Sequence, residues 1–234
     1  MIFQPASVRE EILRTCHLLM RPGDVHEVRI LKAGRRGTIS GYFDNPEVLA
    51  DAVSSLDGNV PGSYITLNPV KPALLARAAN RLQERAQTTT SDVDIVRRRW
   101  LLIDFDPARP AGISSTDREH GRAIAAACGA WDDLRGVGFG DPVVADSGNG
   151  AHLLYQLNLQ NDRTATEMIR RVLAGVAAYS VAADINVDLS VFNAARIVKL
   201  YGTMACKGDN LAERPHRRSR LLEIPDQMTV LEVR

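Results

Sequence analysis

The segment WLLIDFDP, residues 100–107, places two aspartates one residue apart inside an otherwise apolar run. Side chains alternate between the two faces of a β-strand, so Asp104 and Asp106 share one face while Ile103 and Phe105 point to the other. Neighbouring carboxylates repel each other unless a cation lies between them, and hard divalent cations prefer oxygen ligands of this kind. We therefore expect Asp104 and Asp106 to bind Mg²⁺ or Mn²⁺.

A third carboxylate, Asp188, also lies between apolar residues, on an element that could stand beside the first strand. Three carboxylates on one face can hold two metal ions about 3.5–4 Å apart, an arrangement that serves phosphoryl and nucleotidyl transfer. The alternative is structural, because a lone aspartate pair can instead cap a loop or pair with the basic run at residues 97–99. With crowded metal ligands, replacing one aspartate by asparagine should leave thermal stability equal or higher. If the aspartates instead form structural ion pairs, the same replacement should lower thermal stability.

The next polar feature is the loop ADSGNGAH, residues 145–152, which is built from small residues. Its backbone N–H groups can turn outward, and His152 starts a strand directly after them, which suits the binding of phosphate oxygens. Ser147 and His152 are therefore candidate nucleotide contacts. The alternative is a plain hairpin turn followed by a structural histidine.

Cations follow Asp188 closely. Such charges can neutralise a triphosphate that metal ions do not fully cover, and the candidates are Arg196, Lys199 and Lys207. Further along the chain, His216 is expected to contact the nucleotide or to close the pocket. His216 is alternatively a surface side chain. Arg196 and Lys199 are three residues apart, so in a regular strand they point to opposite faces. Both can reach one ligand only if the strand bends or ends between them.

The remaining pattern predicts two units. Residues 1–90 form an N-terminal α/β unit with a helix capped by Ser7, a hairpin over 26–43, a helix over 46–56, a strand in GSYITLNP and a second helix over 72–85. The polar stretch at residues 87–92 marks the boundary.

The second unit, residues 91–234, begins with the Asp104 strand. It continues with a helix over 117–134, a strand pair over 142–157, a helix over 163–182, a short strand at Asp188, the strand ARIVKLYG and a last strand near 220–224. The βαββαβ order predicts an α+β fold: a ferredoxin-like or RNA-recognition-motif-like (RRM-like) palm with an antiparallel sheet and both helices on one face. Such a sheet leaves its other face open for chemistry.

Composition limits the class of protein. The chain has 234 residues, is 45% hydrophobic and carries a formal net charge of +1, so any nucleic-acid surface must be local. Three scattered cysteines indicate a reducing compartment and give no zinc-binding module. The sequence shows neither a signal peptide nor a membrane-spanning stretch. We therefore expect a cytoplasmic protein.

Together these motifs resemble those of the archaeo-eukaryotic primase superfamily, in particular the primase-polymerases of phages, plasmids and mobile or CRISPR-linked loci. The resemblance covers about residues 98–220. Its motifs are a DxD, a histidine after a small residue, a hydrophobic residue followed by aspartate, and basic residues eight and eleven positions later. The matching residues are Asp104, Asp106, His152, Val187, Asp188, Arg196 and Lys199. One departure is that Gly150 occupies the position where family members with an S-x-H motif have serine.

The resemblance implies a DNA primase-polymerase that transfers nucleotides from NTP or dNTP to a 3′-hydroxyl. Asp104, Asp106 and Asp188 would be the catalytic metal ligands for two Mg²⁺ or Mn²⁺ ions. Single-stranded template DNA and a primer would be partners, and any helicase would lie on another chain or segment. Two alternatives remain: a metal-dependent nuclease or replication initiator with a catalytic tyrosine, and a non-catalytic nucleic-acid-binding module.

Overall fold

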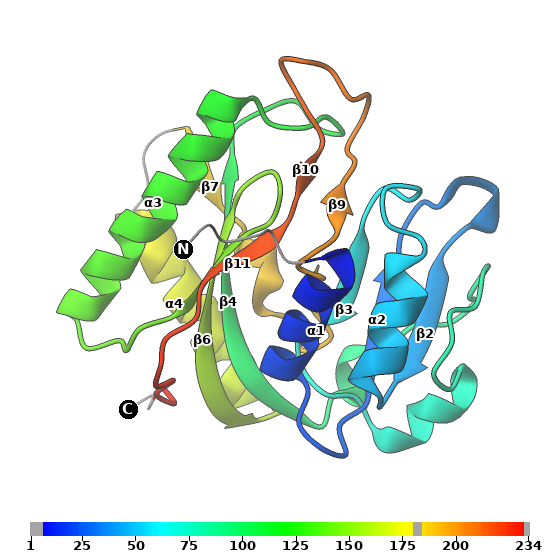
Figure 1. Ribbon diagram of the computed structural model, residues 1–234. Coiled ribbons are helices and arrows are strands. Elements are labelled where there is room, and N and C mark those ends of the chain that lie inside the picture. Colours follow the sequence, from blue (N-terminus) through cyan, green and yellow to red (C-terminus); the bar gives the residue numbers. More distant parts are fainter. Residues whose placement is uncertain (1–6, 180–183, 232–234) are drawn as a thin grey trace.

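Two antiparallel β-sheets lie beside each other in the computed structural model, which describes residues 7–179 and 184–231 (Figure 1). One is a four-stranded sheet in the order β2-β1-β3-β8, and the other is a five-stranded sheet in the order β11-β5-β6-β4-β7. Helices α1 and α2 lie against the first sheet, and α3 and α4 cover one face of the second (Figure 1). The α+β fold expected from the sequence is confirmed.

The N-terminal region follows the predicted order. Its elements are α1 (Val8–Leu19), β1 (His26–Ile30), η1 (Gly34–Arg36), β2 (Ile39–Phe43), α2 (Pro46–Ser54) and β3 (Ser63–Thr66). The side chain of Ser7 accepts a hydrogen bond from the backbone N–H of Glu10, whose carboxylate accepts from the N–H of Ser7. This capping box satisfies two N–H groups that a helix start leaves free, and it confirms the predicted start of α1.

The prediction of a second helix over residues 72–85 is wrong. Only a short 3₁₀ segment, η2 (Pro72–Arg77), forms there. The chain then runs along the free edge of β2, where Ser40 and Gln83 exchange backbone hydrogen bonds and the N–H of Asn80 donates to the carbonyl of Tyr42. Hydrogen bonds to an open strand edge outweigh the helix propensity of an Ala-, Leu- and Arg-rich segment.

The palm contains the predicted βαββαβ unit. Its elements are β4 (Arg97–Pro107), α3 (Asp117–Gly136), β5 (Val143–Asp146), β6 (Ala151–Gln160), α4 (Arg163–Tyr179) and β7 (Ile185–Val187), and β11 (Arg220–Glu223) extends the sheet beyond β5. A short 3₁₀ segment, η3 (Asp92–Asp94), precedes β4. Of the helix predicted over 163–182, residues 180–183 lie outside the described part of the chain.

Strand β8 (Ile197–Lys199), from the predicted ARIVKLYG strand, joins the first sheet and not the palm sheet. It pairs with β3, with Tyr64 opposite Lys199. The 3₁₀ segment η4 (Leu189–Phe192) precedes it, and strands β9 (Met204–Ala205) and β10 (Arg217–Arg218) form a hairpin after it. The division at residue 90 stays a prediction, although residues beyond it complete the first sheet.

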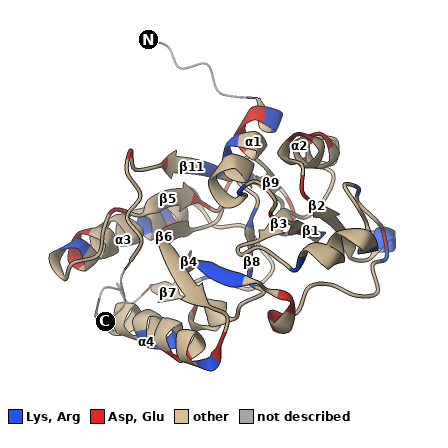
Figure 2. Cartoon of the chain, turned by 90° about the horizontal axis from the view of Figure 1, so that it is seen from below, with Lys and Arg blue, Asp and Glu red and all other residues tan. Residues whose placement is uncertain are grey.

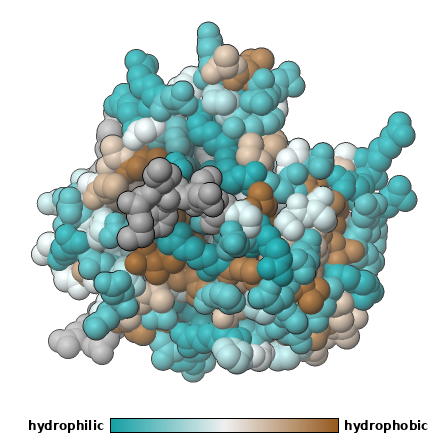
Figure 3. All heavy atoms as spheres, viewed as in Figure 1, coloured by the Kyte–Doolittle hydropathy of each residue, from teal (hydrophilic) through white to brown (hydrophobic). Residues whose placement is uncertain are grey.

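One cluster of buried apolar side chains extends through both regions. It includes Ile12 of α1, Val28 of β1, Leu101 of β4, Leu153 of β6 and Leu173 of α4. On the face that Figure 3 shows, hydrophobic residues occur in small areas among hydrophilic ones. Over residues 7–179 and 184–231, no helix has the length and apolar character needed to cross a membrane.

Candidate active site

Strand β4 presents the two aspartates as the alternation of its side chains requires. Ile103 and Phe105 are fully buried, whereas the side chains of Asp104 and Asp106 are 25% and 43% exposed. Asp104 stands directly opposite His152 of β6, whose Nε2 lies 3.4 Å from Asp104 Oδ1. The register of two long antiparallel strands therefore fixes this carboxylate beside this imidazole.

The structural alternative, in which the basic run at residues 97–99 neutralises the aspartates, is wrong. In Figure 2 the start of β4 is blue, where these arginines follow one another. Arg97 pairs with Asn158, Arg98 binds the carbonyl of Phe192, and Arg99 forms an ion pair with Asp24. None of them reaches Asp104 or Asp106. The described partner of Asp106 is Arg109, with 3.1 Å between Nη1 and Oδ1.

Asp188 follows β7, which pairs with β4 so that Phe105 faces Val187. The N–H of Asp188 donates to the carbonyl of Asp104 at 3.0 Å, which confirms that the third aspartate lies beside the first strand. Its side chain caps η4, since Oδ1 accepts from the N–H of Ser190 at 2.8 Å.

The central cavity, of about 260 Å³, lies between the two sheets and brings most of the predicted residues together. Seven of the predicted site residues line it: Asp104, Asp106, Ser147, His152, Arg196, Lys199 and Lys207. Two strands of the palm sheet supply its acidic side and His152, and Lys199 comes from β8 of the first sheet.

The carboxylate cavity, of about 450 Å³, adjoins the central cavity and shares Asp104, Asp106 and Lys207 with it. Asp188 and Arg109 also line it. The three aspartates therefore face one hollow. The positively charged Arg109 and Lys207 line the same cavity.

Carboxylate oxygens are the donors that Mg²⁺ and Mn²⁺ prefer, so the donor chemistry of the three aspartates fits these ions. In the part of the chain that the structure describes, however, no group of three His, Cys, Asp or Glu side chains is close enough together to hold one ion. Asp106 is paired with Arg109, and Asp188 is engaged by the start of η4. Closing the three carboxylates around an ion therefore requires side-chain movement.

Arg196 and Lys199 reach the same cavity because β8 begins only at Ile197. Arg196 lies before the strand, where its N–H bonds to the carbonyl of Asn193 and its guanidinium binds Ser190. The expected strand end between the two cations is confirmed. The alternation rule applies within a strand, and Arg196 is outside it.

Lys199 is buried, and Nζ donates to the carbonyl of Met204 at 2.7 Å and lies 5.4 Å from the centre of the Tyr64 ring. Burial lowers the pKa of this amine to about 7, with Lys207 and Arg218 adding to the effect. Asp57 secures the neighbouring hairpin: it accepts from the N–H of Met204 and pairs with Arg218 at 2.6 Å.

Repulsion between crowded carboxylates would raise the pKa of Asp104, but the surroundings of this carboxylate lower it. Burial opposes its ionisation, but His152, Lys207 and Arg196 together hold its pKa below the usual value. The carboxylate is therefore stabilised by its surroundings. This direction argues against the expectation that asparagine at this position would leave stability equal or higher, and the stability of the variant stays a prediction.

The loop at residues 147–150 is not a free cradle of N–H groups. Ser147 N–H donates to the carbonyl of Gly150, Gly148 N–H to Asp146 Oδ1 and Gly150 N–H to Ser147 Oγ, so three donors are used within the loop. Gly150 has a steric role, because a Cβ there would lie 2.2 Å from the carbonyl oxygen of Phe105. A serine in place of Gly150 would therefore collide with β4.

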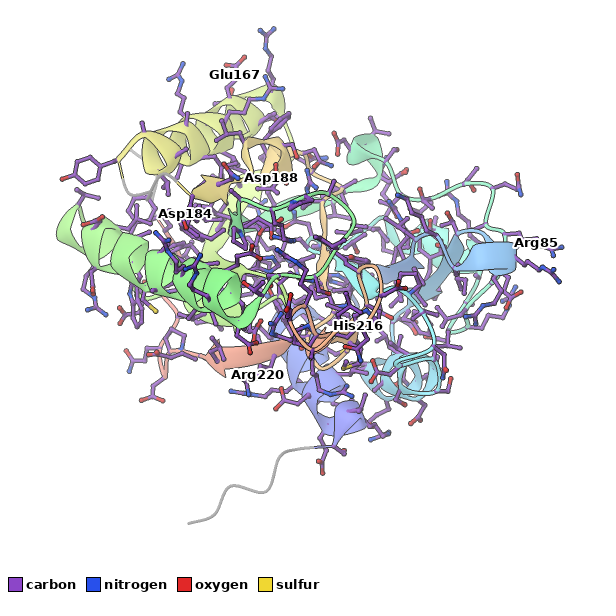
Figure 4. The ribbon with its side chains drawn as sticks, turned by 90° about the horizontal axis from the view of Figure 1, so that it is seen from above. Arg85, Glu167, Asp184, Asp188, His216 and Arg220 are labelled. Carbon is purple, nitrogen blue, oxygen red and sulfur yellow. The ribbon has the colours of Figure 1, made fainter. Side chains whose placement is uncertain are left out.

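His216 lines neither cavity. It lies in the loop between β9 and β10, well apart from Asp188 in Figure 4, and its Nε2 is 2.9 Å from the carbonyl of Gly208. Its contact with a nucleotide stays a prediction.

Three further side chains belong to the site but carried no distinguishing signal in the sequence. Tyr64 of β3 and the buried Asn149 line the central cavity. Tyr201 is wholly buried behind it, with its phenol oxygen 2.7 Å from His152 Nδ1. Each resembles an ordinary core or turn residue in sequence, because only long-range folding brings it to the cavity.

No protein-family model and no curated protein matches the sequence. Among solved structures, the crystal structure of primase RepB' aligns with a TM-score of 0.55 and 10% identity, covering 95% of this chain and 58% of that chain. The polymerase domain of Mycobacterium tuberculosis ligase D in complex with DNA aligns with a TM-score of 0.44 and 14% identity, covering 90% of this chain and 79% of that chain. The first likeness shows a primase-like fold, and this chain spans 58% of the length of RepB'.

Proposed function

We propose that this protein is a nucleotidyltransferase of the primase-polymerase type. It would join nucleotides from NTP or dNTP to a 3′-hydroxyl under the direction of single-stranded DNA, with release of pyrophosphate. One observation carries the proposal: Asp104, Asp106 and His152 share a central cavity with Arg196, Lys199 and Lys207. Carboxylates opposite cations suit a substrate that combines metal ions with a polyphosphate.

Asp104, Asp106 and Asp188 would hold Mg²⁺ or Mn²⁺ in the carboxylate cavity. Bound there, such ions lower the pKa of an attacking 3′-hydroxyl and stabilise a pyrophosphate leaving group. Arg109 would have to release Asp106, since the two are paired at 3.1 Å. Its guanidinium would then be free to contact a phosphate oxygen.

The cations of the central cavity would hold the triphosphate. Arg196 can donate two parallel hydrogen bonds to phosphate oxygens, whereas Lys199 and Lys207 act as point charges. His152 would donate from Nε2, the nitrogen that faces Asp104. Ser147 lines the same cavity, and its hydroxyl would be a secondary contact.

A nuclease or initiator that forms a covalent adduct with DNA is the second candidate, because Tyr64 lines the cavity together with Asp104 and Asp106. Burial and then the two negative aspartates raise the pKa of this phenol. A phenol with a raised pKa is a poor nucleophile without a base. We therefore favour nucleotidyl transfer.

A polymerisation assay tests the proposal. Purified protein is incubated with single-stranded template, Mg²⁺ or Mn²⁺ and labelled nucleotides, with and without a primer. We expect labelled products that lengthen with time and that disappear in Asp104→Asn but persist in Asp132→Asn, a control on the exposed surface of α3. Labelled DNA covalently attached to the protein, and lost in Tyr64→Phe, would instead establish the second candidate.

A further inference from the structure

Tyr201 is a buried phenol with a single described partner. The residue is wholly inaccessible, and its ring lies 5.8 Å from the His152 ring, centre to centre. The phenol oxygen is 2.7 Å from His152 Nδ1. Within residues 7–179 and 184–231, this oxygen makes no other hydrogen bond.

The phenol hydrogen of Tyr201 needs a hydrogen-bond acceptor, because the side chain is wholly buried. Burial, and then the nearby Asp104 and Asp146 carboxylates, raise the pKa of the phenol, so it keeps its proton. If the phenol donates to Nδ1, both groups are satisfied. If Nδ1 carried a proton and donated instead, the phenol hydrogen would be buried with no acceptor among the described residues, which is costly.

The other ring nitrogen leads to the same assignment. His152 Nε2 lies 3.4 Å from Asp104 Oδ1, and a carboxylate can only accept. His152 lines the central cavity with only 4% of its surface exposed, so it has little freedom to turn away. An acceptor beside Nε2 and a donor beside Nδ1 both place the imidazole hydrogen on Nε2.

We propose that Tyr201 is a positioning residue that fixes His152 in the tautomer with the proton on Nε2, so that the imidazole donates a hydrogen bond into the central cavity. The tautomer follows from the geometry alone. Its consequence, donation to a phosphate oxygen of the nucleotide, rests on the proposed function. Tyr201 would act without touching the substrate.

Nitrogen-15 NMR of histidine-labelled protein near pH 8, where an ordinary imidazole is neutral, reads the tautomer directly. His152→Gln identifies the resonances of His152 among those of the five histidines. We expect the parent protein to show a protonated Nε2 and an unprotonated Nδ1. We expect Tyr201→Phe to show a mixture of tautomers, because Nδ1 has lost its donor.

Tyr155→Phe is the matched control. Tyr155 is also a buried tyrosine of the palm, but its hydroxyl has no hydrogen-bond partner among the described residues. This variant should leave the His152 resonances unchanged. A protonated Nδ1 in the parent protein, or an unchanged tautomer in Tyr201→Phe, would overturn the proposal. If Tyr201→Phe does not fold, Asp104→Ala decides instead, because it removes the acceptor beside Nε2 and keeps Tyr201. The proton should then stay on Nε2, and a mixture of tautomers would overturn the proposal.

Steady-state kinetics then test the consequence for nucleotide binding. Tyr201→Phe should raise the nucleotide KM about 10-fold, the effect of one neutral hydrogen bond, while kcat changes less. Tyr155→Phe should keep parent kinetics. If the chain incorporates no nucleotide at all, the proposed function fails while the NMR result still decides the role of Tyr201.

Discussion

The two sheets contribute opposite charges to the central cavity, and they do so by different structural means. Asp104, Asp106 and His152 stand on long palm strands whose pairing fixes their positions residue by residue. Lys199 stands on the three-residue strand β8 of the other sheet, and Arg196 lies just before that strand. The acidic side therefore depends on regular strand register. The basic side depends on where one short strand begins and pairs.

This difference makes the basic side sensitive to the N-terminal region. Lys199 faces Tyr64 across the β3–β8 pairing, and Asp57 holds the hairpin to which Lys199 donates. Residues before position 90 thus place a cation that lies more than a hundred residues later. The predictions below test how far each side depends on the other.

The largest expected effect is loss of folding when the regions are separated. A fragment of residues 91–234 lacks the β3 partner of β8 and the α1 side chains Ile12 and Cys16 of the shared core. We expect the fragment to show no cooperative thermal unfolding by circular dichroism, whereas the full chain does. A fragment that unfolds cooperatively would show that the palm is independent of the first sheet.

Asp104→Asn should reduce nucleotide incorporation by about 10³-fold or more, because a neutral amide replaces a carboxylate at the proposed metal site. In metal-free buffer at neutral pH, this variant should also melt at a lower temperature than the parent. The reason is that His152, Lys207 and Arg196 stabilise the ionised carboxylate. Calorimetric melting checks this, with Asp132→Asn as the control. A raised melting temperature would instead show that repulsion between neighbouring carboxylates lowers the stability of the parent protein.

Arg196→Ala should lower kcat/KM for nucleotide by about 10²-fold, affecting both kcat and KM, since a guanidinium can follow charge that builds up on the leaving pyrophosphate. Lys199→Ala should mainly raise KM. Steady-state assays over a range of nucleotide concentrations separate the two. Parent nucleotide kinetics in both variants, together with weaker DNA binding and a shallower salt dependence, would assign these cations to the template path.

The smallest expected effect is a change in how stability depends on pH. Lys199 has a pKa of about 7 in the folded protein against 10.5 ordinarily, so between these values the unfolded chain binds more protons than the folded one. Stability contributed by this group should therefore rise as pH increases from about 7 to about 10. Urea unfolding of Lys199→Met should lack this rise. An identical pH profile in parent and variant would contradict the burial of a titrating amine.

The sequence determined those parts of the site that depend on local geometry. Alternation along β4 put Asp104 and Asp106 on one face, the capping box started α1 at Ser7, and the order of elements predicted the palm. These features depend on residues close together in the chain, so local propensity and side-chain periodicity are sufficient.

Only the tertiary structure decided where other segments found their hydrogen-bond partners. Residues 72–85 have the composition of a helix, but in the structure they lie along β2. The sequence of β8 does not indicate which of the two sheets it joins, and in the structure it pairs with β3. The contact between Tyr201 and His152 joins residues 49 positions apart. Most buried N–H, carbonyl and hydroxyl groups form hydrogen bonds, and the partner of each is set by which surfaces meet in the fold.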